Sequence, residues 1–282
     1  MDIVCFILNY NDSLRTSKLA KKIVSFNSIG KIVILDNNSI DKNILSTEIN
    51  DKKIDIIFSK ENLMYAGGTQ KGLEYIFDNY NAKYILIINS DVDFEENTLK
   101  YCYDFMKKEN CGLCSPTMLN INGEIDSDCY WNEKKYFDLI KFCFFLGRRK
   151  KQKYNIKNSS QKVDCIRGSF QLFSANALKA IDGYDTNIKL YYEEDIIGRK
   201  LKLNGYSSFI FKDVFYKHNH NHLKKYRTNI FKICLNDMYY YWENYFKTNI
   251  FLKFFLKLCI HLGIFEHKIM DCFLWLFELK KG

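Results

Sequence analysis

Short apolar runs alternate with amphipathic stretches along the first 90 residues of the chain. The apolar runs predict four buried strands, at residues 3–8, 31–35, 55–58 and 84–88. Apolar side chains at helical spacing, with polar residues between them, predict helices at residues 14–26 and 69–79. Because strands that alternate with helices form a mostly parallel sheet covered by helices, the sequence predicts an α/β fold of the Rossmann-like type.

The pattern changes twice further along the chain. After a helix at residues 95–108 we expect an irregular segment over 112–158. Short helices follow at residues 175–181 and 191–203, the second of which ends at Asn204-Gly205. Residues 223–282 are rich in Lys, Phe, Leu, Tyr and Trp and predict two or three amphipathic helices.

Polar residues gather where the predicted strands end. The clusters are Asn9-Tyr10-Asn11-Asp12 after the first strand, Asp36-Asn37-Asn38-Ser39 after the second, and Asn89-Ser90-Asp91 with Asp93 after the fourth. One such cluster is ordinary chemistry for a turn or a helix cap. Because ligands of parallel α/β sheets bind beyond the carboxyl ends of the strands, three clusters at this edge predict a binding site.

Composition narrows the class of protein and of ligand. A hydrophobic content of 47%, with one proline and 13 glycines, excludes a linker-rich or fibrous chain. The formal net charge of +9 fits an anionic partner, which is a nucleotide diphosphate, an acidic lipid surface or a nucleic acid. The start of the chain has no pattern of a secretory signal, so we expect free thiols in a reducing cytoplasm, with Cys111 and Cys114 in the core.

Two carboxylate centres carry the candidate chemistry. Asp91-Val92-Asp93, directly after the fourth strand, offers hard oxygen ligands to Mg²⁺ or Mn²⁺, an ion that can bridge a diphosphate. Glu194-Asp195 begins a predicted helix, where the helix dipole favours an ionised carboxylate that can act as a general base. Both patterns also occur as plain loop and helix-start chemistry.

Several segments, in order and at similar spacing, resemble signatures of glycosyltransferase family two, and in particular its rhamnosyltransferase-like branch. The segments are Asn9-Tyr10-Asn11, Leu35-Asp36-Asn37-Asn38-Ser39-Ile40-Asp41, Glu61-Asn62-Leu63-Met64-Tyr65-Ala66-Gly67-Gly68, Ile87-Ile88-Asn89-Ser90-Asp91-Val92, Gly168-Ser169, Gly183-Tyr184-Asp185, Tyr192-Glu193-Glu194-Asp195-Ile196, Arg199 and His218. The resemblance implies a GT-A fold with a C-terminal helical extension. It divides the chain into a nucleotide-sugar-binding half (1–93), an acceptor-binding and catalytic half (94–222) and a C-terminal amphipathic helical region (223–282).

The resemblance also implies roles for individual residues. The donor would be held by Asn9, Tyr10, Asp12, Asp36, Asn38 and Asp91, with close backbone approach at Gly67 and Gly68. Mn²⁺ or Mg²⁺ would be held by Asp91, Asp93 and His218. Asp195 would be the catalytic base, supported by Glu194, and Arg199 would steady the helix by pairing with the carboxylate four residues before it. Asn89 departs from the family pattern, because it stands where the first acid of the metal motif is expected.

The C-terminal region and the late histidines leave alternatives open. No run within residues 250–279 reaches the roughly twenty uncharged residues that a membrane span needs. A helix there either lies on an anionic membrane surface or packs against the catalytic half. His218, His220 and His222 would share one face of a strand, but no fourth zinc ligand is indicated. The basic run at residues 148–151 is typical of a solvated loop.

The sequence thus predicts an inverting glycosyltransferase that moves a sugar from a UDP-, dTDP- or GDP-type donor to a hydroxyl of a glycan or lipid-linked acceptor. We expect it to act in bacterial surface polysaccharide or lipid-linked glycan synthesis, in the cytoplasm or at the inner face of the cell membrane, with membrane contact through residues 223–282. The alternative is a noncatalytic nucleotide-sugar or anionic-surface binding protein on the same fold. A nucleotidyltransferase is disfavoured because residues 9–12, after the first strand, contain no glycine for a phosphate-binding loop. A nucleic-acid partner is disfavoured because the carboxylates at the strand ends repel phosphate.

Overall fold

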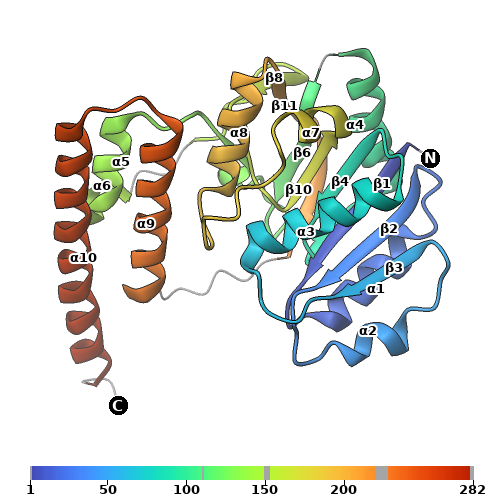
Figure 1. Ribbon diagram of the computed structural model, residues 1–282, viewed down its shortest axis with the longest axis horizontal. Helices are drawn as coiled ribbons and strands as arrows, with labels where there is room; N and C mark the ends of the chain where they lie inside the picture. The colour runs from blue at the N-terminus through green and yellow to red at the C-terminus, as the bar shows by residue number, and fades with distance from the viewer. Residues whose placement is uncertain (1, 110, 149–152, 220–227, 280–282) are drawn as a thin grey trace.

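The computed structural model describes residues 2–109, 111–148, 153–219 and 228–279 (Figure 1). Its main feature is a nine-stranded mixed sheet with the order β3-β2-β1-β4-β10-β6-β11-β5, in which β8 also pairs with β11. The strands of this sheet are β1 (Ile3–Asn9), β2 (Ile29–Asp36), β3 (Ile54–Phe58), β4 (Tyr84–Ile88), β5 (Val92–Asp93), β6 (Cys111–Leu119), β8 (Ser160–Val163), β10 (Phe170–Ser174) and β11 (Ser207–His218). A second, two-stranded sheet consists of β7 (Tyr130–Trp131) and β9 (Cys165–Ile166).

The first four strands are parallel, and β10 reverses the direction. β1 pairs in parallel with β2 and β4, and β2 pairs in parallel with β3. β10 lies antiparallel to both β4 and β6, and its first residue, Phe170, is paired with Ile88 at the end of β4. The start of β10 therefore lies at the same edge of the sheet as the carboxyl ends of β1 to β4.

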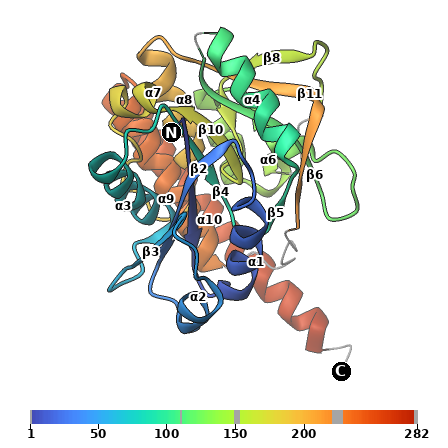
Figure 2. The same cartoon turned by 90° about the vertical axis from the view of Figure 1, so that its right-hand side faces the viewer.

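Helices cover both faces of this sheet, as Figures 1 and 2 show together. α3 and α7 lie on one face, and α1 and α4 lie on the other. The bounds of the helices in this part are α1 (Ser13–Ile23), α2 (Asn43–Glu48), α3 (Met64–Asn79), α4 (Glu96–Lys108), α7 (Ala175–Ala180) and α8 (Glu193–Leu203). Because both faces are covered, the central strands are almost continuously apolar and buried.

Four further helices stand beside the sheet, on the left of Figure 1. They are α5 (Tyr136–Cys143), α6 (Phe145–Arg148), α9 (Thr228–Tyr245) and α10 (Ile250–Leu279), and a short 3-10 turn at Ser127–Cys129 leads into β7. α9 contacts both α8 and α10, and α5 and α6 pack against α10. In the part of the chain that the structure describes, no helix combines the length and the apolar character needed to cross a membrane.

The predicted fold class is confirmed: a mostly parallel α/β sheet is flanked by helices and followed by a C-terminal helical extension. The expected irregular segment over 112–158 is wrong, because β6 runs through its first residues. Eight of the nine residues of β6 are buried, and Ser115-Pro116-Thr117 interrupts its apolar pattern in the sequence. The domain boundaries after residues 93 and 222 stay predictions.

Nine of the ten cysteines are core residues. All ten are free thiols and nine are buried, among them Cys111 and Cys114 as predicted. Burial raises the pKa of the Cys129 thiol to about 11 and that of Cys143 to about 12. These thiols are therefore protonated near neutral pH and serve as small apolar side chains.

Candidate active site

A buried hydrogen-bond network joins the loops after β1 and β2. The Asn9 amide nitrogen donates to Asp36 (Oδ2, 2.8 Å) and lies 3.0 and 3.1 Å from the hydroxyls of Ser13 and Ser39. The other oxygen of Asp36 accepts from the backbone N–H of Ser39 (2.9 Å), and the Thr16 hydroxyl donates to the side-chain oxygen Oδ1 of Asn9 (2.7 Å). Asn9 and Asp36 are fully buried under the two loops. Their hydrogen bonds therefore fix the shape of both loops from the protein interior.

The loops after β3 and β4 join the same network. The Asn37 amide nitrogen donates to Asn62 (2.9 Å), and the Asn37 side-chain oxygen accepts from the backbone N–H of Leu63 (2.9 Å). After β4, the Ser90 hydroxyl donates to Asp12 (2.8 Å). The loops after β1, β2, β3 and β4 therefore form one connected surface, which we call the polar rim. The Asn37 and Asn62 contacts also explain why α3 begins at residue 64 instead of the predicted residue 69.

Backbone strain is concentrated around the polar rim. Asn11 (φ 53°) and Asn38 (φ 63°) lie in two of its loops, Met64 (φ 59°) is the first residue of α3, and Tyr192 (φ 72°) directly precedes α8. Asp182 is the only other non-glycine residue with a positive φ in the described part of the chain. Asparagine tolerates this conformation, but Met and Tyr rarely adopt it, and strain of this kind gathers at functional sites. The strain marks this edge as the candidate active site.

The predicted donor-binding residues divide into a buried and an exposed set. Asn9 and Asp36 are enclosed and bonded to each other, and Asp12 is partly buried beside Ser90. Tyr10 and Asn38 are exposed on the polar rim. The buried residues therefore shape the polar rim, whereas the exposed Tyr10 and Asn38 are accessible to a ligand. The donor-binding role of each residue stays a prediction.

Gly67 and Gly68 lie in the first turns of α3. A Cβ atom on Gly68 would stand 2.7 Å from Leu8 Cδ1 and 3.4 Å from the Asn37 amide nitrogen, so glycine lets α3 pack closely against β1. A Cβ atom on Gly67 would stand 3.2 Å from the Cβ of Leu63. Packing alone therefore accounts for glycine at position 68, and the donor approach at both glycines stays a prediction.

Asp91 and His218 are the candidate metal ligands that the fold brings together. His218 Nε2 lies 3.1 Å from Asp91 Oδ1, and the backbone N–H of Asn219 donates to the Asp91 carbonyl (2.8 Å). Asp93 instead pairs with Lys22 (2.7 Å). No three His, Cys, Asp or Glu side chains within the described ranges are grouped to hold a metal ion. Asp91 and His218 are thus the two side chains that would hold a Mn²⁺ or Mg²⁺ ion here, and their role as ligands stays a prediction.

Glu194, in the first turn of α8, lies at the same edge. Its Oε1 accepts from the backbone N–H of Gly168 (3.0 Å), and the Tyr65 hydroxyl donates to the Gly168 carbonyl (3.0 Å). The carbonyl of the next residue, Ser169, accepts from the backbone N–H of Asn89, directly after β4 (3.1 Å). A short chain of hydrogen bonds therefore links Glu194 to the polar rim.

Asp195 faces a different set of residues. Its buried carboxylate accepts from the indole N–H of Trp131 (3.2 Å) and pairs with the Lys134 ammonium (3.2 Å). The predicted pairing of Arg199 with Asp195 is wrong. Arg199 forms an ion pair with Glu133 (3.1 Å), and Asp195 forms one with Lys134. β7 and the residues directly after it thus enclose the predicted base.

Glu193 is a third carboxylate, for which we predict no role from the sequence. Its side chain is buried, and it follows the left-handed Tyr192. Burial, together with the neighbouring charge of Glu194, raises the pKa of Glu193 well above its usual range. Three consecutive acids therefore have three environments: Glu193 is enclosed, Glu194 lies at the rim, and Asp195 contacts Trp131 and Lys134.

Asp237 of α9 holds the backbone directly before α8. Its buried carboxylate accepts from the N–H groups of Lys189 (3.2 Å), Leu190 (3.0 Å) and Tyr191 (3.2 Å). Burial raises the pKa of Asp237, and the backbone donors offset part of that rise. The C-terminal helices thus fix the path of the segment that presents the α8 carboxylates.

Sequence reasoning misses Asp237, Trp131 and Lys134. Trp131 and Lys134 lie in the segment expected to be irregular, where no periodicity places them. Asp237 carries a usable signal, since it lies on the apolar face of α9 beside the buried Leu235 and Met238. A carboxylate on such a face needs polar partners.

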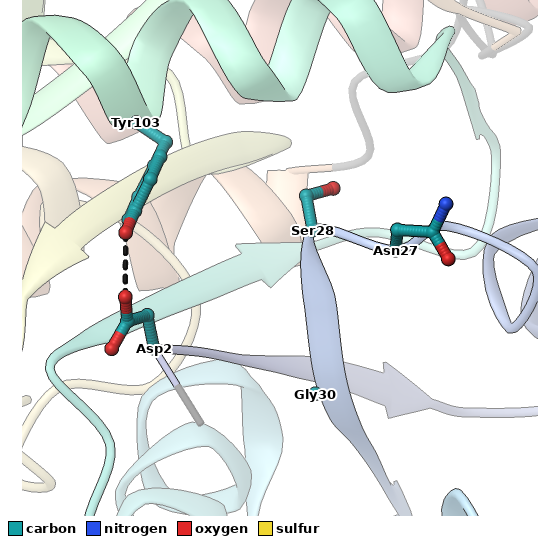
Figure 3. Close-up of a pocket in the computed structure, with 5 residues that line it drawn as sticks. All are labelled: Asp2, Asn27, Ser28, Gly30 and Tyr103. Atoms are coloured by element: carbon teal, nitrogen blue, oxygen red, sulfur yellow. Dashed lines mark hydrogen bonds between the residues drawn. The ribbon is translucent and has the colours of Figure 1, made fainter.

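A hollow of about 430 Å³ lies at the opposite edge of the sheet (Figure 3). It is lined by Asp2, Asn27, Ser28, Gly30 and Tyr103, near the amino ends of β1 and β2. The Tyr103 hydroxyl donates to Asp2 (2.6 Å) and lowers the pKa of that carboxyl. No predicted site residue lines it, so we do not place the active site there.

The predicted roles of His220 and His222, and most of the basic run at 148–151, fall outside the described residues.

The fold is that of GT-A glycosyltransferases. GalNAc-T7, solved with UDP, GalNAc and Mn²⁺, matches with a TM-score of 0.63 at 12% identity, over 87% of this chain and 49% of that one. TarS 1–349 of S. aureus, solved with UDP-GlcNAc, matches with a TM-score of 0.60 at 13% identity, over 95% of this chain and 72% of that one. At these identities the likeness concerns the fold alone.

The family is defined by sequence. The model of Glycosyl transferase family 2 matches residues 7–181, more than half of the chain, and the chain belongs to this family. A curated relative, the Low-salt glycan biosynthesis hexosyltransferase Agl10 of Haloferax volcanii, is 25% identical over 193 residues, which are 68% of this chain. The match spans 59% of that relative's length.

Proposed function

We propose that this protein is an inverting glycosyltransferase that moves a sugar from a nucleotide-sugar donor to an acceptor hydroxyl. The observation that carries the proposal is the meeting of the polar rim with the α8 carboxylates at one edge of the sheet, through Glu194 and Gly168. Family membership and the name of the curated relative, a hexosyltransferase of glycan biosynthesis, support it. The UDP and UDP-GlcNAc in the two structural relatives favour a UDP-type donor over a dTDP- or GDP-type one.

We assign the metal, Mn²⁺ or Mg²⁺, to Asp91 and His218. When bound, such an ion neutralises a diphosphate and improves it as a leaving group. The contact between the two side chains supports this assignment, as does the Mn²⁺ in the GalNAc-T7 structure. Asp93 would join only by leaving Lys22, so it is outside the proposed ligand set.

Asp195 is the proposed base, and Glu194 supports it. The carboxylate would accept the proton of the acceptor hydroxyl while that oxygen attacks the anomeric carbon opposite the leaving diphosphate, which inverts the configuration. Trp131 and Lys134 hold Asp195 in one orientation. Since Glu194 is less buried than Asp195, the two carboxylates must be tested separately.

The acceptor is proposed to be a glycan or a lipid-linked molecule, in bacterial surface polysaccharide or lipid-linked glycan synthesis at the cytoplasmic face of the membrane. The resemblance to the rhamnosyltransferase-like branch makes rhamnose a candidate sugar, and the curated relative makes a hexose another. Three carboxylates at the head of α8 favour an enzyme over a noncatalytic binding protein on the same fold.

Thermal unfolding of the purified protein with UDP-, dTDP- and GDP-sugars, each with and without Mn²⁺, tests the donor half of the proposal. A ligand that binds only the native state raises the midpoint, by about 5 °C at saturating concentration for a chain of this size. We expect a Mn²⁺-dependent rise with one nucleotide class, lost in Asp91→Asn and kept in the matched control Asp93→Asn. Unchanged midpoints with every donor would contradict the proposal.

A further inference from the structure

The outer face of α10 carries a continuous band of large apolar side chains. Each is between 41% and 80% exposed, and together they are Phe251, Phe254, Phe255, Leu258, Leu262, Phe265 and Ile269. Spacings of three and four residues place all seven on one side of the helix. From residue 251 to residue 269 this apolar band extends about 27 Å along the helix axis. Exposed apolar surface of this extent marks an interaction site.

The opposite side of α10 packs against the protein. Leu256, Cys259, Ile260 and His267 are buried, and α10 contacts α9 and α5. The Tyr136 hydroxyl of α5 donates to the carbonyl of Leu252 (2.8 Å). The packing alternative therefore holds for one face of α10. The other face is exposed in the part of the chain that the structure describes.

The charges of α10 are divided between these faces. Glu266 accepts from the backbone N–H of Phe145 (2.8 Å), and Asp271 accepts from the first backbone N–H of α9 (3.2 Å). These are the only acidic residues in residues 250–272, and both face protein partners. Lys257 and Lys268 are exposed, and helical spacing places them at one border of the apolar band. The uncovered face is therefore apolar at its centre and cationic at its border.

We propose that the apolar band docks on the surface of a bilayer that contains acidic phospholipids, with α10 parallel to the membrane plane. The seven apolar side chains would enter the boundary between headgroups and acyl chains, and the border lysines would meet the anionic headgroups. The net charge of +9 favours an acidic bilayer as the occupant over a second copy of the chain, because two such copies repel each other.

Docking in this way would bring the acceptor side of the candidate site toward the lipid. α9 lies between α10 and α8, and Asp237 of α9 holds the segment that precedes α8. Two helix-to-helix spacings, about 20 Å in all, then separate α10 from the axis of α8. This arrangement suits an acceptor carried on a lipid. The docking itself requires neither donor nor transfer.

Co-sedimentation of the full chain with vesicles of phosphatidylcholine, with and without phosphatidylglycerol, tests the proposal. We expect at least about tenfold stronger binding to the acidic vesicles, weakened by added salt. The double variant Phe254→Ser/Phe265→Ser should lose at least about tenfold of that binding, because two of the seven anchors become polar. Ile121→Ser, which removes an exposed apolar side chain in the loop after β6, is the matched control and should bind as the wild type does.

A second variant keeps the test decisive if the double serine variant does not fold. Lys257→Glu/Lys268→Glu retains the apolar band and should lose the preference for acidic vesicles. Equal binding to both vesicle types, or wild-type binding by the serine variant, would overturn the proposal. A dimer in light scattering that the serine variant abolishes, without vesicle binding, would assign the apolar band to a second copy. Because no donor is present, these failures would leave the proposed function standing.

Discussion

The proposed donor side of the candidate site, which is the polar rim, and its proposed acceptor side, which carries the α8 carboxylates, are assembled differently. On the donor side, Asn9 and Asp36 are 27 positions apart, and they belong to consecutive strands of the parallel sheet. On the acceptor side, Trp131 lies 64 positions from Asp195, and the contact from Asp237 to Tyr191 spans 46 positions and comes from the C-terminal helices. The sheet topology alone therefore creates the polar rim, whereas the α8 carboxylates depend on segments that fold onto them from elsewhere.

This difference separates two kinds of defect. Loss of a contact on the acceptor side should lower the rate of transfer and leave donor affinity unchanged. Loss of a contact within the polar rim should lower stability and donor affinity together.

The largest effect is expected at the proposed base. Asp195→Asn should lower the rate of transfer by about a thousandfold, because the amide cannot accept the proton of the acceptor hydroxyl. Glu194→Gln should lower it by about tenfold, since Gly168 loses a charged partner while Asp195 remains. Initial rates with saturating donor measure both. The reverse order of effects would make Glu194 the base and Asp195 its support.

Asp237→Asn should lower kcat by about a hundredfold and change the KM for the donor by less than about twofold. The amide has one acceptor oxygen, and its NH₂ group opposes the backbone donors before α8, so the carboxylates shift. Glu243→Gln is the matched control in the same helix, because Glu243 pairs with Lys253 near the surface (3.3 Å) and with Tyr239 (3.1 Å), away from the segment before α8. A similar loss of kcat in the control, or a change confined to the donor KM, would contradict the positioning role.

The same division explains what could be predicted from the sequence. Strand alternation and the polar clusters after β1, β2 and β4 are local patterns, so the sequence predicts the fold class and the polar rim. It does not predict β6, because Ser115-Pro116-Thr117 interrupts the apolar pattern of this buried strand. The partner of Arg199 was also out of reach, because helical spacing offers Asp195 while the fold brings Glu133 from 66 positions away.

Within the rim, Asn9→Ala should lower the free energy of unfolding by about 2 kcal/mol, because the buried carboxylate of Asp36 loses a donor. Urea denaturation measures the change. Tyr10→Phe, at the neighbouring exposed position, is the control and should change stability by less than about 0.5 kcal/mol. Equal stability of Asn9→Ala and the wild type would show that the network does not hold the loops.

The smallest effect concerns pH. The pKa of Glu193 is raised in the folded state, so between the unfolded and folded values the folded chain holds a proton that the unfolded chain has released. Stability from this group is therefore present at low pH and falls as pH rises through that window. Glu193→Gln removes this loss, so the difference in thermal midpoint between variant and wild type should grow in favour of the variant from about pH 5 to pH 8. A difference that stays constant with pH would contradict the burial of an ionisable group.

The separation of the two sides is tested most directly by the affinity for the nucleotide sugar that raises the thermal midpoint. Isothermal titration calorimetry on the wild type, Asp195→Asn and Asn9→Ala gives three dissociation constants under one set of conditions. We predict a Kd for Asp195→Asn within about twofold of the wild type, and a Kd for Asn9→Ala at least about tenfold higher. Equal weakening in both variants, or unchanged binding by Asn9→Ala, would contradict a donor site that depends on the polar rim and not on Asp195.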